Sequence, residues 1–146
     1  MLQDSRKIDV IRFYQLGKDC IEDAGFLYEN KKNQSFSILL IHGIELVLKS
    51  YILLKDENIK VEDLKKRPFG HECQKLLDKS KKLGFENIFS KEAVEVLEFL
   101  FGYYSNDSIE VRYRTKTGLK LFPPDIFKVL REKVFPTMRF LIGPTK

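Results

Sequence analysis

Cysteine and histidine, the residues that most often carry crosslinks, metals or proton transfer, are scarce in this chain. Its 146 residues include two of each, Cys20 and Cys73, and His42 and His71. Two cysteines so far apart make a poor disulfide framework for a domain of this length, which favours free thiols in a reducing compartment. No cluster has the spacing of zinc ligands. The sequence therefore predicts neither a structural metal nor a cofactor.

An apolar leader is also missing, because residues 1–12 are polar and contain no hydrophobic stretch of the kind that a signal peptide needs. The longest apolar stretch, residues 36–54, has about the length of a membrane span. It is interrupted by His42, Glu45 and Lys49, and charges are costly at bilayer depth. We expect a buried core helix there, in a cytoplasmic protein that contacts no membrane.

The short motifs of common enzyme classes are absent from the sequence, which has no phosphate-binding P-loop, dinucleotide fingerprint or serine-nucleophile elbow. With no internal repeat and no linker, we expect one domain over residues 1–146. Apolar residues make up 43% and charged residues 32%, a balance that argues against disorder. The net charge of +5 and the pI of about 9.1 weakly favour polyanionic partners.

Helical periodicity dominates what is present. Apolar residues recur three or four positions apart in five segments, which predict helices over residues 5–28, 34–55, 71–83, 90–104 and 125–141. The fold class that we expect is all-α, an antiparallel bundle of about five helices. A long basic loop precedes the last helix, and a short hairpin over residues 109–122 is an alternative for part of it.

Three residues are expected to shape the helix ends. Ser90 is a suitable N-cap for the fourth helix, and Gly84 is well placed to terminate the third. Pro136 should kink the last helix.

A polar stripe follows one side of the second predicted helix, which is otherwise apolar nearly all round. Glu45 and Lys49 are four residues apart and face the same way, His42 precedes Glu45 by one turn, and Ser35 and Asp56 extend the line loosely. Burying a carboxylate and an ammonium is costly unless they pair. The stripe is either an ion pair with a hydrogen-bonded histidine at a groove edge, or the lining of a site shared with another helix or subunit.

A second feature lies between the fourth and fifth helices, where cationic and aromatic residues alternate as Arg112, Tyr113 and Arg114. Guanidinium groups bind phosphate and aromatic rings stack on exposed bases, so this pattern suits RNA. It also suits an ordinary solvated loop. His71 lies at the start of the third predicted helix, where it would act as a general base, contact phosphate or simply help to cap the helix.

Three segments together resemble the HEPN family, named for higher eukaryotes and prokaryotes nucleotide-binding. Residues 41–51 resemble its second helix, with its Glu-x-x-x-Lys pattern at Glu45 and Lys49; residues 70–77 are similar to the Gly-His-Asp-Leu start of its next helix; and Arg112-Tyr113 looks like its Arg-Tyr or Arg-Asn position. The resemblance implies a bundle of helices, often dimeric. It also implies a role in RNA cleavage, in toxin–antitoxin or phage-defence systems, or in nucleotide binding.

The chain departs from the family pattern at one point. Active members are metal-independent ribonucleases in which a histidine follows the arginine after four to six residues. Here that window after Arg112 holds Thr117, Gly118 and Leu119, and no histidine follows His71. The leading hypothesis is therefore a non-catalytic module that binds RNA, a nucleotide or a partner protein.

Such a module would use a groove lined by His42, Glu45, Lys49, Arg112 and Arg114, with Tyr113 between the two arginines. The resemblance adds an antitoxin or a nucleotidyltransferase-type protein as a partner, and a homodimer. One alternative is a ribonuclease toxin, in which Arg112 stabilises the phosphate while His71 or His42 handles the proton. Another is a purely structural dimerisation module.

Overall fold

The computed structural model describes residues 4–30, 33–65, 73–104 and 123–144, and these parts are helical without any strand. Two long helices, α1 (Asp4–Glu29) and α2 (Asn33–Lys55), come first. The remaining elements are α3 (Val61–Leu64), α4 (Cys73–Lys82), α5 (Phe85–Ile88), α6 (Lys91–Tyr104), α7 (Pro123–Val129), η1 (Leu130–Val134) and α8 (Phe135–Ile142). The expected all-α class is confirmed. The expected basic loop and the alternative hairpin lie outside the described residues.

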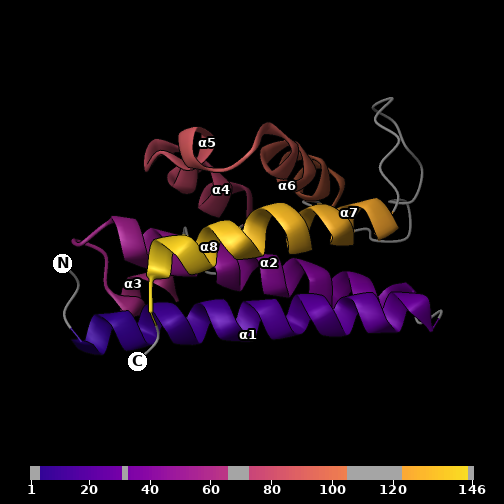
Figure 1. The fold of residues 1–146 in the computed structure, drawn as a ribbon, viewed down its shortest axis with the longest axis horizontal. Helices are drawn as coiled ribbons and strands as arrows, with labels where there is room; N and C mark the ends of the chain where they lie inside the picture. The colour runs from indigo at the N-terminus through magenta and orange to yellow at the C-terminus, as the bar shows by residue number, and fades with distance from the viewer. Residues whose placement is uncertain (1–3, 31–32, 66–72, 105–122, 145–146) are drawn as a thin grey trace.

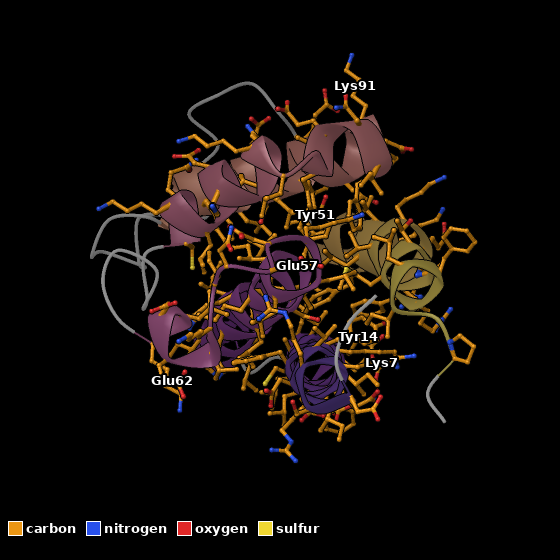
Figure 2. The ribbon with its side chains drawn as sticks, turned by 90° about the vertical axis from the view of Figure 1, so that its left-hand side faces the viewer. Lys7, Tyr14, Tyr51, Glu57, Glu62 and Lys91 are labelled. Atoms are coloured by element: carbon orange, nitrogen blue, oxygen red, sulfur yellow. The ribbon has the colours of Figure 1, made fainter. Side chains whose placement is uncertain are left out.

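The helices pack around α2 (Figure 1). Helices α1 and α2 run antiparallel and side by side, and α4, α5 and α6 lie on the opposite side of α2 from α1. The unbroken run from α7 through η1 to α8 contacts both α1 and α6. Figure 2, which looks along the long helices, shows α2 near the middle, with Tyr51 directed toward the α4–α6 layer.

Helix α2 is the most buried element. Residues 43–53 are buried without exception, and apolar side chains from α1 to α8 form one hydrophobic cluster around them. The stretch from Phe36 to Lys55 has the length and composition of a membrane span, yet 67% of it is buried inside the bundle. The expectation of a core helix is confirmed, and the burial is compatible with a soluble protein.

Two glycines set the distance between α1 and α2. A Cβ atom placed on Gly43 would lie 2.7 Å from the carbonyl oxygen of Gly17, and one placed on Gly17 would lie 2.8 Å from a methyl group of Val47. Real Cβ atoms do not approach other atoms so closely, so the two helices pack backbone against backbone at this crossing.

A clamp made by one arginine joins the start of α1 to the end of α2. The Arg6 guanidinium donates to the carbonyl oxygens of Leu53 (3.0 Å), Ile59 (2.6 Å) and Asp56. The last turn of a helix leaves carbonyl groups without amide partners. Because α1 and α2 are antiparallel, the first turn of α1 delivers a cation to that end, where it also suits the helix dipole.

Most of the expected helix ends are confirmed. The Ser90 hydroxyl accepts a hydrogen bond from the Ala93 amide (3.1 Å) and so caps α6. Gly84 has a φ of 90°, a left-handed conformation that glycine adopts without strain, and it separates α4 from α5. Helix α4 is described from Cys73, and the expected helix start at residue 71 lies outside the described residues.

The last helix deviates from the expectation in form. A π-helical turn, η1, ends at Val134, and Pro136 is the second residue of the α-helix α8 that continues from it. Proline has no amide hydrogen and cannot donate to the preceding turn, and a π turn is one way to accommodate that loss. The Thr137 hydroxyl donates to the Lys133 carbonyl oxygen (2.9 Å), which satisfies a carbonyl of this turn.

The short helices α3 and α5 were not expected from the sequence. In α5 the ring of Phe85 stacks on Phe89 with centroids 4.1 Å apart, and Tyr51 of α2 meets both rings edge-on. The Tyr51 hydroxyl donates to the Leu83 carbonyl oxygen at 2.9 Å. This aromatic cluster fixes the α4–α5 turn against α2.

Candidate functional site

The core of the site is an ion pair inside α2. The Lys49 ammonium donates to the Glu45 carboxylate, with Nζ and Oε2 2.7 Å apart, and the two side chains are only 8% and 5% exposed. The residues are one helical turn apart, so the helix itself holds them in register. Two oppositely charged groups are thus buried in the central, mostly apolar helix, where each compensates the charge of the other.

His42 connects this pair to the surface. Its Nδ1 atom lies 3.9 Å from Oε1 of Glu45, and its side chain is 48% exposed. The Glu45 carboxylate therefore lies between an accessible imidazole and a buried ammonium. A solute at the surface can reach His42 directly.

The first residue of α4 lies beside the pair. Burial, and to a smaller extent the Glu45 carboxylate, raise the pKa of the Cys73 thiol to about 12, and the Lys49 ammonium partly opposes this rise. Helices α2 and α4 contact each other. Since the thiolate is the nucleophilic form of cysteine, Cys73 at neutral pH is a neutral neighbour of the pair.

The structure brings together part of the predicted site. His42, Glu45 and Lys49 form a continuous line from the surface to the interior. His71 lies outside the described residues, as do Arg112, Tyr113 and Arg114, so their approach to this line stays a prediction. His71 precedes Cys73 by two positions in the chain.

Asp56 was expected to extend the polar stripe loosely, and it has a different role. Its carboxylate binds the Lys79 ammonium at 2.9 Å and accepts a hydrogen bond from the backbone amide of Asn58 at 3.0 Å. The bond to Lys79 is the main cause of the lowered pKa of Asp56, and the Arg6 charge contributes. Asp56 thus ties α2 to α4 and belongs to the same helix end as the Arg6 clamp.

Sequence reasoning missed the position of Cys73 beside the pair. Its place directly after the Gly70-His71-Glu72 segment was the one signal that pointed there. Nothing in the sequence indicated that Lys79 would bind Asp56, because the two residues are on separate helices.

At its outer end the arrangement presents the His42 imidazole, which can form a hydrogen bond with a ligand, while the Lys49 ammonium lies at the buried end and donates to Glu45. An imidazole beside a carboxylate is a common arrangement in general acid–base catalysis. Comparison of the chain with protein-family models, with curated proteins and with solved structures finds no match.

Proposed function

We propose that this protein is a HEPN-like, non-catalytic module of the cytoplasm that binds RNA, a nucleotide or a partner protein in a prokaryotic defence or toxin–antitoxin context. The observation that carries the proposal is the Glu45–Lys49 ion pair, buried in the central helix with His42 exposed beside it.

The ion pair supports a functional role because it is a poor device for stability. Replacing a buried ion pair by well-packed apolar side chains is often neutral or stabilising. Between residues 46 and 53 all side chains except Lys49 and Ser50 are apolar or aromatic. Burial of this helix in the core therefore does not require the ion pair. A charged pair that reaches the surface through a histidine instead favours ligand contact.

In the proposed complex, Lys49 together with Arg112 and Arg114 binds phosphate groups, and Glu45 orients Lys49. Tyr113 stacks on a base. Guanidinium groups form two parallel hydrogen bonds with a phosphate, which gives orientation as well as affinity. The surplus of 26 basic over 21 acidic residues favours the approach of a polyanion.

The test is fluorescence anisotropy of a labelled single-stranded RNA and of a labelled ATP analogue, in EDTA, over a salt series. Wild type should bind one of these probes with an affinity that falls as salt rises. Arg112→Ala should weaken binding at least about tenfold, because a charge-assisted bond is lost. Arg12→Ala is the matched control, since Arg12 is an exposed arginine on α1. An equal loss in both variants, or no binding of either probe, contradicts the binding of RNA or a nucleotide.

One observation favours the ribonuclease alternative, namely that His42 is accessible and faces a carboxylate. Gel analysis of the same RNA, again in EDTA, distinguishes the two. Cleavage that is abolished in Arg112→Ala and in either His42→Ala or His71→Ala would replace the binding module by an enzyme. If the protein neither binds nor cleaves these probes, the results favour the third alternative, a purely structural dimerisation module.

A further inference from the structure

A hollow lies between the middle of α1 and the end of α8. Its volume is about 340 Å³, which is within the range of small-molecule sites in proteins. Helix α1 contributes Ile11, Tyr14 and Lys18, and the opposite wall contains Arg139 and Ile142 of α8. The hollow shares no residue with the line from His42 to the buried ion pair of α2.

The charges that line this hollow are all of one sign. Among its described lining residues, Lys18 and Arg139 are cations and none is a carboxylate. Arg139 is exposed in the last turn of α8, and it forms no ion pair with any described part of the chain. Burial raises the pKa of Tyr14, and the Arg139 charge opposes this rise, so the guanidinium lies near the Tyr14 hydroxyl. The hollow therefore offers an unpaired guanidinium to a ligand.

The second cation, Lys18, is held in place by two neighbours. Its Nζ atom lies 3.1 Å from the Glu22 carboxylate, and its side chain is 21% exposed. The same atom lies 5.7 Å from the centre of the Phe135 ring, a distance at which an aromatic face attracts a cation. Because Glu22 compensates the charge of Lys18, the surplus at the hollow is about one positive charge, that of Arg139.

The rest of the hollow is suited to an apolar group. Ile11 and Ile142 line it from opposite walls, together with Tyr14. The Tyr14 hydroxyl donates to the Phe135 carbonyl oxygen at 3.2 Å, which fixes its ring between α1 and α8 (Figure 2). Gly143, also in the lining, has a φ of 81°, and no described atom lies within 4 Å of the place where its Cβ would be. The chain thus leaves α8 without filling the hollow.

We propose that this hollow binds a small organic carboxylate, with the carboxylate on Arg139 and an apolar body against Ile11, Tyr14 and Ile142. The two oxygens of a carboxylate match the donor fork of a guanidinium. A surplus of one positive charge suits a monoanion better than a phosphate monoester, which carries about −1.5 to −2 at neutral pH. The proposal does not depend on the binding of RNA or a nucleotide.

Titration of ¹⁵N-labelled protein at neutral pH, followed through its amide chemical shifts, tests the proposal. Benzoate and hexanoate are the probes, and at least one of them should shift the amides of Tyr14, Lys18 and Ile142 saturably. Benzamide has nearly the shape of benzoate but no charge, so it should bind at least about tenfold more weakly. Phenyl phosphate should bind no more tightly than benzoate. The proposal is overturned if neither carboxylate shifts these amides, or if benzamide or phenyl phosphate binds more tightly than both carboxylates.

A pair of arginine variants locates the site. Arg139→Gln should weaken carboxylate binding at least about tenfold, because a charge-assisted hydrogen bond is lost. Arg131→Gln is the matched control, since Arg131 is an exposed arginine of the same helical run that does not line the hollow, and it should bind as wild type does. The amide spectrum of each variant shows whether it is folded. Unchanged binding by folded Arg139→Gln, or an equal loss in both variants, overturns the assignment of the site.

Discussion

Gly17 of α1 and Gly43 of α2 lie against each other so closely that a methyl group on either would come within 2.7 Å of the carbonyl oxygen of the other. Gly17→Ala should therefore lower the free energy of unfolding by at least about 2 kcal/mol, because two backbones would have to separate. The loss should appear although alanine is the better helix former. Urea denaturation followed by circular dichroism measures it.

Gly25→Ala, in the same helix, is the control for this prediction. Its added methyl group meets Phe127 at an ordinary distance, so the gain in helix propensity should raise stability by up to about 1 kcal/mol. The measurement should use protein dilute enough for single chains. If both alanine variants change stability in the same direction, the crossing is not as close as described.

The buried ion pair predicts strong coupling between its two residues. Lys49→Met should lower stability by about 3–5 kcal/mol, because it leaves a buried carboxylate without its cation. In the variant with both Glu45→Gln and Lys49→Met no net charge remains to be compensated. A double-mutant cycle from urea denaturation should give a coupling energy of about 1–3 kcal/mol. Additive effects would show that the pair contributes nothing as a pair.

The lowered pKa of Asp56 predicts that the protein loses stability in acid. Its native pKa is lowered below the ordinary value of 3.8, chiefly by the bond to Lys79. A carboxyl group with a lowered native pKa stabilises the fold above its unfolded pKa, and this stabilisation fades as the pH falls through the native pKa. Unfolding free energies measured between pH 6 and pH 2 should thus fall less steeply in Asp56→Asn than in wild type.

Lys79→Met separates this effect from general acid denaturation. It removes the main cause of the lowered pKa and leaves the carboxyl group in place. Its acid profile should also flatten. A Lys79→Met profile that is parallel to wild type would mean that the bond between Lys79 and Asp56 does not stabilise the protein in solution.

The raised pKa of Cys73 predicts that its thiol is alkylated slowly. A pKa of about 12 in place of 9.0 leaves roughly a thousandfold less thiolate at neutral pH, and alkylation depends on the thiolate. In a Cys20→Ser background, iodoacetamide should label native Cys73 far more slowly than the unfolded chain. Adding Glu45→Gln should speed the labelling, because the carboxylate raises the pKa of this thiol. Labelling that is unaffected by Glu45→Gln would place Cys73 away from the pair.

The sequence was sufficient to predict the long helices and the residues at helix ends. The bounds of α1 and α2 lie within one residue of those expected from apolar spacing, and Ser90 and Gly84 act as their residue types suggest. These features depend on neighbours along the chain. The same holds for the Glu45–Lys49 pair, since four residues along one helix fix the two side chains on one face.

Contacts between distant segments were beyond the reach of such reasoning. Nothing local indicates that Arg6 binds carbonyl groups about fifty residues away, or that Gly17 packs against Gly43. The helices α3 and α5 have four residues each, less than the length at which apolar periodicity can be recognised. The sequence alone predicted the site residues on α2. The position of Cys73 beside them could not be predicted, because it depends on how α4 packs on α2.

The Arg6 clamp also bears on the order in which the fold assembles. The carbonyl groups that it binds at the end of α2 and just beyond it gain this partner only after α1 has folded back along the whole of α2. Segments that complete one another in this way open and close as one cooperative unit. The amide protons in the last turn of α2 should thus exchange with deuterium in concert with those of the first turn of α1, and the two helix ends should resist exchange or lose that protection together.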